Sequence, residues 1–213
     1  MELVLNPMKF VKKNMKPEVL ITDLIERTRT NMNQAEALRD LPDEVLTWSP
    51  REESWNILEC LEHLNRYGDF YLPEIEKRVK ASSFRAEDFK SGWLGEYFAK
   101  SMLPREKLNK MKTFKKMDPM RDDLNKPVLN REVIDEFIKQ QKQTLDLLHK
   151  SREVSLRRTK TAISISSWIK LRLGDTFRVL IYHNQRHMEQ VSKILKAHPD
   201  CPSKLSGYLS LLL

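Results

Sequence analysis

Four long segments of the chain repeat apolar residues at helical spacing, and this pattern constrains the fold more than any other feature. The segments cover about residues 17–39, 55–80, 131–152 and 176–197. In each, the apolar positions fall on one stripe of a helix with 3.6 residues per turn, which predicts an amphipathic helix with one buried face. Strand-like alternation is nearly absent: residues 162–168 form one β-leaning run, and one strand cannot make a sheet. We therefore expect an all-α protein.

Four amphipathic helices are most simply buried as a four-helix bundle. The connection at about residues 81–130 is rich in lysine and is interrupted by glycine and proline. We interpret it as a basic, partly helical crossover that runs over the outside of the core and could carry a lid or a partner-binding surface. The chain, residues 1–213, is then a single domain with one basic insertion.

Short polar residues mark the expected helix starts. Ser54, Asn130 and Asp175 stand before the second, third and fourth segments, where such side chains are typical N-caps. Pro73 lies inside the second segment, and because proline lacks a backbone N–H we expect a bend there.

The charge balance and the cysteines restrict location and partners. The formal net charge is +8, but the basic residues form separate groups in residues 9–16, 107–116 and 157–160, so a solvated surface is a better interpretation than a nucleic-acid interface. Two cysteines make no disulfide framework. We see no signal peptide, and the apolar run 209–213 is far too short to span a bilayer. We expect a cytoplasmic protein with no membrane partner.

Three histidines form the most informative constellation. His183 and His187 are four residues apart in the last segment, so their Cβ atoms should lie about 5–6 Å apart on one helical face. His63 lies at the margin of the second segment's stripe, with the same offset as His183. Three neutral imidazoles could meet where these helices pack and hold one divalent metal ion with open positions. The alternative is that they are ordinary histidines at the edge of the core.

Two stretches also resemble a known family. Residues 54–64, SWNILECLEHL, have a tryptophan near the helix start and a His-Leu pair two turns later, as in the second-helix motif of the DinB/YfiT superfamily. His183 to His187, continuing to Glu189 and Gln190, is similar to that family's last-helix motif. The resemblance covers roughly residues 18–197. It implies an up-up-down-down bundle and a nickel, zinc or iron ion held by His63, His183 and His187.

The resemblance also implies a homodimer and a small-molecule substrate. Activities in the wider family include metal-dependent hydrolysis, and transfer or isomerisation with low-molecular-weight thiols such as bacillithiol, mycothiol or glutathione. The long basic insertion at 81–130 departs from the family's pattern and leaves the substrate open.

Other side chains near the histidine motifs have more ordinary interpretations. Glu59 and Tyr67 lie one turn to either side of His63 and could contact it, but a solvated residue and a packed core residue are the simpler interpretations. Cys60 is on the apolar stripe and is expected to be an inert buried thiol. His149 and His198 are expected at the surface or at a helix end. His198 with Cys201 is a metal pair that lacks further ligands.

The leading functional hypothesis is a metal-dependent enzyme. A metal would activate water for hydrolysis, or a thiol as its thiolate for group transfer. The alternative is a stress-related metal-binding or scaffold protein that keeps the bundle and catalyses nothing.

Overall fold

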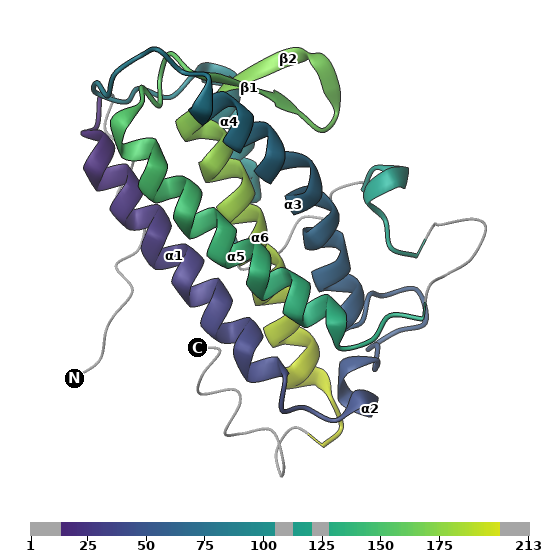
Figure 1. The fold of residues 1–213 in the computed structure, drawn as a ribbon. Helices are drawn as coiled ribbons and strands as arrows, with labels where there is room; N and C mark the ends of the chain where they lie inside the picture. The colour runs from purple at the N-terminus through teal and green to yellow at the C-terminus, as the bar shows by residue number, and fades with distance from the viewer. Residues whose placement is uncertain (1–13, 105–112, 121–127, 201–213) are drawn as a thin grey trace.

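Four long helices form the body of the protein. The structure is a computed structural model and describes residues 14–104, 113–120 and 128–200. The bundle helices are α1 Pro17–Leu38, α3 Ile57–Lys80, α5 Glu132–Lys150 and α6 Leu173–Ala197. They pack in a closed ring in which α1 and α3 each contact both α5 and α6 (Figure 1). The predicted all-α helical bundle is confirmed.

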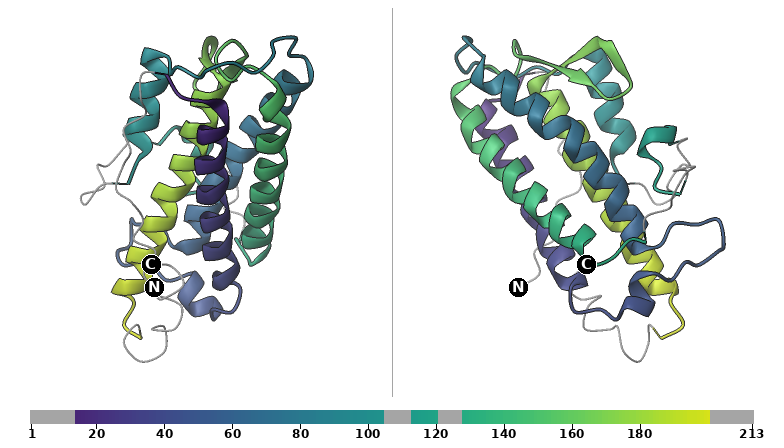
Figure 2. Two further views of the ribbon diagram at one scale, coloured as in Figure 1. Left: turned by 90° about the vertical axis from the view of Figure 1, so that its left-hand side faces the viewer. Right: turned by 45° about the vertical axis from the view of Figure 1, so that its right-hand side comes forward.

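The directions of the helices differ from the expected up-up-down-down order. One core cluster joins the starts of α1 and α6 to the ends of α3 and α5, and a second cluster joins the opposite ends. Helices α1 and α6 therefore run one way, and α3 and α5 run the other (Figure 2). The reason lies in the connections. Residues 39–56, with the short helix α2 Asp43–Leu46, stay at one end of the bundle, so α3 must run back.

The insertion between α3 and α5 is partly helical, as expected. It contains α4 Trp93–Met102, which packs on α6, and the 3-10 turn η1 Lys115–Met117, which lies beside α3. Residues 105–112 and 121–127 of the insertion lie outside the described residues.

A buried ionic network seats α4 on α6. Arg178, 2% exposed, places its guanidinium 2.6 Å from Glu96 and 3.3 Å from Asp175. The carboxylate of Asp175 also accepts hydrogen bonds from Ser91 and, at 2.8 Å, from the backbone N–H of Gly92. A Cβ at Gly95 would lie 2.3 Å from the Asp175 carboxyl carbon, so this close approach of the two helices requires glycine.

The three expected helix caps all need correction. Helix α3 begins at Ile57, and its cap is Asn56, not Ser54. The Asn56 side chain accepts from Glu59 N–H while the Glu59 carboxylate accepts from Asn56 N–H, both at 2.8 Å, which completes a capping box. Asn130 lies one residue before Arg131, the cap position of α5, although its side chain does accept a hydrogen bond from Glu132 N–H at 2.8 Å. Asp175 is no cap, because α6 already begins at Leu173 and the buried carboxylate holds α4 instead.

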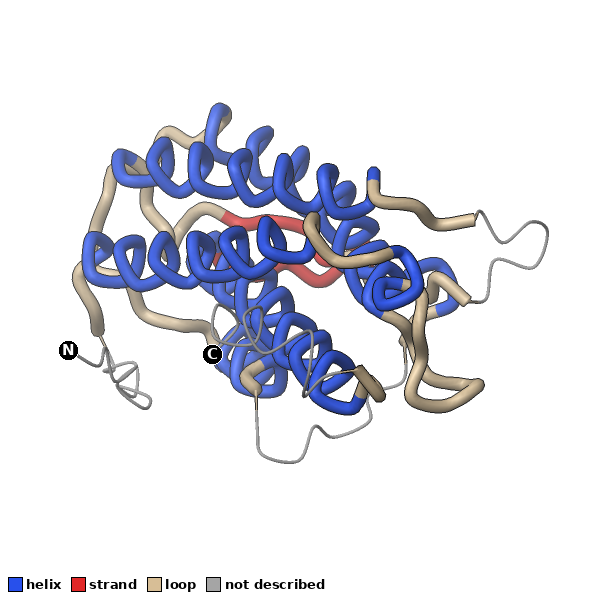
Figure 3. The backbone as a smooth tube through the Cα atoms, turned by 90° about the horizontal axis from the view of Figure 1, so that it is seen from below, coloured by secondary structure: helices blue, strands red, loops and turns tan. Residues whose placement is uncertain are grey.

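A two-stranded hairpin is the clearest departure from the sequence-based expectation. Strands β1 Lys160–Ile163 and β2 Ser166–Arg172 pair antiparallel between α5 and α6, where a single β-leaning run was expected (Figure 3). Thr161, Ile163 and Leu171 turn into the core. Charged residues alternate with these three positions, so too few apolar residues remain for the strand pattern to show in the sequence.

Two further observations concern the helices. Helix α3 continues through Pro73. No helix among the described residues is long and apolar enough to cross a membrane.

Candidate metal centre

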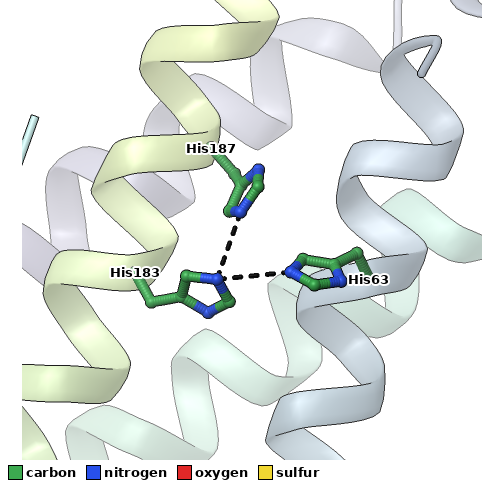
Figure 4. Close-up of side chains that lie close together, drawn as sticks. All are labelled: His63, His183 and His187. Atoms are coloured by element: carbon green, nitrogen blue, oxygen red, sulfur yellow. Dashed lines mark hydrogen bonds between the residues drawn. The ribbon is translucent and has the colours of Figure 1, made fainter. Parts of the chain in front are cut away.

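The three predicted histidines meet between α3 and α6. The Nε2 atom of His183 lies 3.3 Å from Nε2 of His63 and 3.1 Å from Nε2 of His187 (Figure 4). All three side chains are buried, and their ligand atoms lie within 4.8 Å of one another. Within the described part of the chain, this is the one group of three such side chains close enough to share a metal ion.

Polar contacts between helices fix the rotation of the two helices that carry the histidines. The amide of Asn184 donates to Gln141 of α5 at 3.1 Å, which turns the neighbouring His183 towards α3. The amide of Asn65 donates to the Val133 carbonyl at 2.9 Å, which sets the rotation of α3 near His63. Because His183 and His187 are four residues apart on α6, the same rotation aims both rings at His63.

Hydrogen bonds on the far side of two rings decide which nitrogen faces the centre. Nδ1 of His63 lies 2.6 Å from the Met117 carbonyl oxygen, which can only accept a hydrogen bond. Nδ1 of His187 lies 3.0 Å from Oε1 of Gln190. Both rings therefore carry their proton on Nδ1 and present the Nε2 lone pair to the centre.

The converging lone pairs fit a divalent ion. With metal–nitrogen bonds of about 2.0–2.1 Å, two ligands at the tetrahedral angle stand roughly 3.3 Å apart. The two closest Nε2 separations, 3.3 and 3.1 Å, are close to that value. Three neutral nitrogens also leave at least one coordination position for a substrate or water, which distinguishes catalytic from structural sites.

Burial keeps all three histidines neutral. Desolvation lowers the pKa of His63 to about 4. Desolvation is the main cause that holds the pKa values of His183 and His187 well below the ordinary value. Repulsion between two protonated rings and the positive charge of Arg186 lower them further. Neutral imidazole is the form that binds metal ions, so the site is ready for a cation at neutral pH.

Aromatic rings wall the site. The Trp55 ring lies 4.7 Å from that of His63 and 5.8 Å from that of His187, measured between centroids. The Tyr67 ring lies 5.0 Å from His63 and 4.7 Å from His183. Burial raises the pKa of Tyr67 to about 12, so its phenol stays protonated at neutral pH. Tyr67 was expected as core packing, and Trp55 is the tryptophan of the motif at residues 54–64. Both also contact the candidate ligands.

The insertion contributes a contact that sequence reasoning missed. Arg66 donates to the backbone carbonyls of Lys116 and Asp118, at 3.4 and 3.2 Å, and pairs with Glu62 at 2.9 Å. These bonds hold η1 so that the Met117 carbonyl reaches His63. A backbone carbonyl leaves no mark in a sequence, whereas Gln190 stands three residues after His187 and could have been proposed from that spacing.

The remaining candidates lie apart from the centre. The carboxylate of Glu59 is used by the capping box, and burial raises the pKa of the fully buried Cys60 thiol, as expected for an inert cysteine. His149 is exposed on α5. The His198 ring packs on Trp48, with centroids 5.0 Å apart, and Cys201 lies outside the described residues.

Comparison with known protein families gives a match over most of the chain. The sequence model of the DinB superfamily matches residues 24–191, which include all three histidines. No match was found among curated proteins, and none among solved structures.

Proposed function

Because the chain belongs to the DinB superfamily, we propose that it is a metal-dependent enzyme acting on a small-molecule substrate at His63, His183 and His187. The proposed reaction is hydrolysis, or transfer involving a low-molecular-weight thiol. The observation that carries the proposal is the convergence of three buried Nε2 atoms from two helices on one point.

The three Nε2 atoms would hold a divalent ion such as nickel, zinc or iron, because sites of this kind accept several such ions. When bound, the ion would lower the pKa of a coordinated water or thiol and so make a nucleophile available near neutral pH.

The surrounding residues have supporting roles in this proposal. The Met117 carbonyl and Gln190 would hold the rings of His63 and His187 in the orientation that binds. Trp55 and Tyr67 would limit the access of bulk water. The protonated Tyr67 phenol would donate a hydrogen bond to a substrate oxygen but would not act as a base, since its pKa is raised to about 12.

Positive charge near the centre favours an anionic nucleophile. Desolvation is the main cause of the lowered pKa values of His183 and His187, and the positive charge of Arg186 lowers them further. The field that disfavours a proton on the rings also stabilises a hydroxide or a thiolate placed among them.

Elemental analysis of the purified, untagged protein tests the metal. We expect close to one equivalent of a divalent metal in the wild type and little in His63→Ala. The exposed His149→Ala is the matched control and should keep its metal. Equal metal content in wild type and His63→Ala would remove the basis of the proposal.

Turnover is a separate test. Metal-loaded and chelator-stripped protein would be compared on a panel of esters and amides, and on electrophiles with low-molecular-weight thiols. Metal-dependent turnover that His183→Ala abolishes supports the enzyme. Bound metal without turnover on the panel favours the alternative, a non-catalytic metal-binding or scaffold protein.

A further inference from the structure

The tip of the hairpin exposes apolar side chains. Trp168 is 93% exposed, and Ile165 and Ile169 beside it are exposed as well. Their apolar surface lies in water, at an energetic cost. Clustered exposed apolar residues mark interaction sites more often than isolated ones do.

Helix α4 adds aromatic rings to the same end of the bundle. Trp93, 83% exposed, and Tyr97 lie four residues apart and so share one face of α4. The first turn of α4 and strand β2 together line a hollow of about 270 Å³, to which Trp93, Lys170 and Arg172 all contribute. The start of α4, which carries Trp93, thus adjoins strand β2 of the hairpin, and the two elements lie at the same end of the bundle (Figure 1).

The base of the hairpin is cationic. Lys160 stands directly opposite Arg172 in the strand register, and Lys170 lies two residues away on the same strand as Arg172. Like charges directly opposite each other repel. Within the described part of the chain, neither Lys160 nor Lys170 has an ion-pair partner. The carboxylate that lines the hollow, Asp175, already accepts hydrogen bonds from Ser91 and Gly92 and forms an ion pair with Arg178.

We propose that this end of the bundle docks on the surface of an anionic phospholipid bilayer. The hairpin tip, with Ile165, Trp168 and Ile169, would enter the boundary between headgroups and acyl chains, where tryptophan is favoured. The cations behind it, Lys160, Lys170 and Arg172, would meet the headgroup phosphates. The net charge of +8 adds long-range attraction to such a surface.

Charge and side-chain chemistry argue against other occupants. A second copy of this chain would bring Lys160, Lys170 and Arg172 against the same cations, so the expected homodimer must use another face. The bases of single-stranded nucleic acid would stack on tryptophan, but the two isoleucines at the tip have neither an aromatic ring for stacking nor a charge for the phosphates. The inference departs from the expectation of no membrane partner, which rested on the lack of a spanning segment. Surface docking does not need one, and the patch contains none of the three histidines.

Vesicle sedimentation with the full chain tests the proposal. We expect binding to vesicles of equal parts phosphatidylcholine and phosphatidylglycerol, and none to phosphatidylcholine alone. Trp168→Ser should weaken the partition coefficient at least about fivefold, and Lys170→Glu roughly tenfold. The matched controls are Val128→Ser and Lys142→Glu, which remove an exposed apolar residue and reverse an exposed charge away from the patch, and should stay within about twofold of wild type. Circular dichroism would check that each variant is folded.

Tryptophan fluorescence gives a second measurement. Emission should shift to shorter wavelength on addition of anionic vesicles, and the shift should be smaller in Trp168→Ser. Absence of binding to anionic vesicles would overturn the proposal. Equal loss of binding in Lys142→Glu and Lys170→Glu would overturn it too, since net charge rather than the patch would then be responsible. Tight binding of a single-stranded oligonucleotide without vesicle binding would reassign the patch to nucleic acid.

Discussion

Nε2 of His183 lies 3.3 Å from Nε2 of His63, across 120 residues of sequence. It also lies 3.1 Å from Nε2 of His187, so His183 stands between the other two candidate ligands. Two further contacts, from Met117 and Gln190, turn the outer rings towards it.

Replacing the middle histidine should abolish metal binding without unfolding the bundle. His183→Ala removes the nitrogen closest to both others, and the remaining pair binds a divalent ion weakly. We expect metal affinity to fall at least about a hundredfold by isothermal titration. His149→Ala should match the wild type. Unchanged affinity in His183→Ala would show that the ion, if any, binds elsewhere.

Gln190 should act as a positioning residue for His187. Its Oε1 lies 3.0 Å from Nδ1 of His187, and loss of such a contact typically costs ten- to a hundredfold in metal affinity. We expect Gln190→Ala to show a loss of roughly tenfold. Gln190→Glu, which keeps an acceptor oxygen, should bind more tightly than Gln190→Ala. Equal affinity in the two variants would show that the hydrogen bond does not position the ring.

The metal-free protein should lose stability in mild acid. In the unfolded chain the histidines take up protons near their ordinary pKa of about 6.5, whereas burial holds the pKa of His63 in the fold at about 4. Between these values the unfolded state binds more protons, so the free energy of unfolding falls as pH falls. The full effect of His63 alone is on the order of 3 kcal/mol. Urea unfolding of chelator-treated protein at about pH 7 and about pH 5 measures the part of this effect that falls between those two pH values, on the order of 2 kcal/mol.

The matched variant for the acid experiment is His63→Gln. Glutamine does not titrate, so this variant should lose less stability between the two pH values than the wild type. An equal loss in both proteins would assign the acid sensitivity to other groups.

The fold and the candidate site were predictable to different degrees. The four helices were predictable from their apolar stripes. His183 and His187 were predictable from their i, i+4 spacing, and His63 from its position at the margin of its stripe, because all of these are local features of the sequence. The direction of α3 was not predictable from its stripe, which is the same whichever way the helix runs. It depends on where residues 39–56 pack.

The features that could not be predicted from the sequence involve backbone atoms or charged side chains whose positions depend on the tertiary structure. The Met117 carbonyl has no side-chain signature, and its position depends on Arg66 reaching η1. Asp175 has the residue type and position of a cap, yet its carboxylate is buried against α4. Hairpin residues such as Lys160 and Lys170 dilute the apolar alternation that identifies strands.

The buried ion pairs of Arg178 with Glu96 and Asp175 should contribute far more to the free energy of unfolding than the exposed ion pair between Lys100 and Glu96. Arg178→Met leaves the buried Asp175 and the half-buried Glu96 without their guanidinium partner, and such losses cost about 3–5 kcal/mol. Lys100 pairs with Glu96 at 3.2 Å, but its side chain is 53% exposed, so Lys100→Met should change stability by no more than about 1 kcal/mol. Urea unfolding of both variants gives the comparison. If Arg178→Met proved as stable as Lys100→Met, the network would not be what holds α4 to α6.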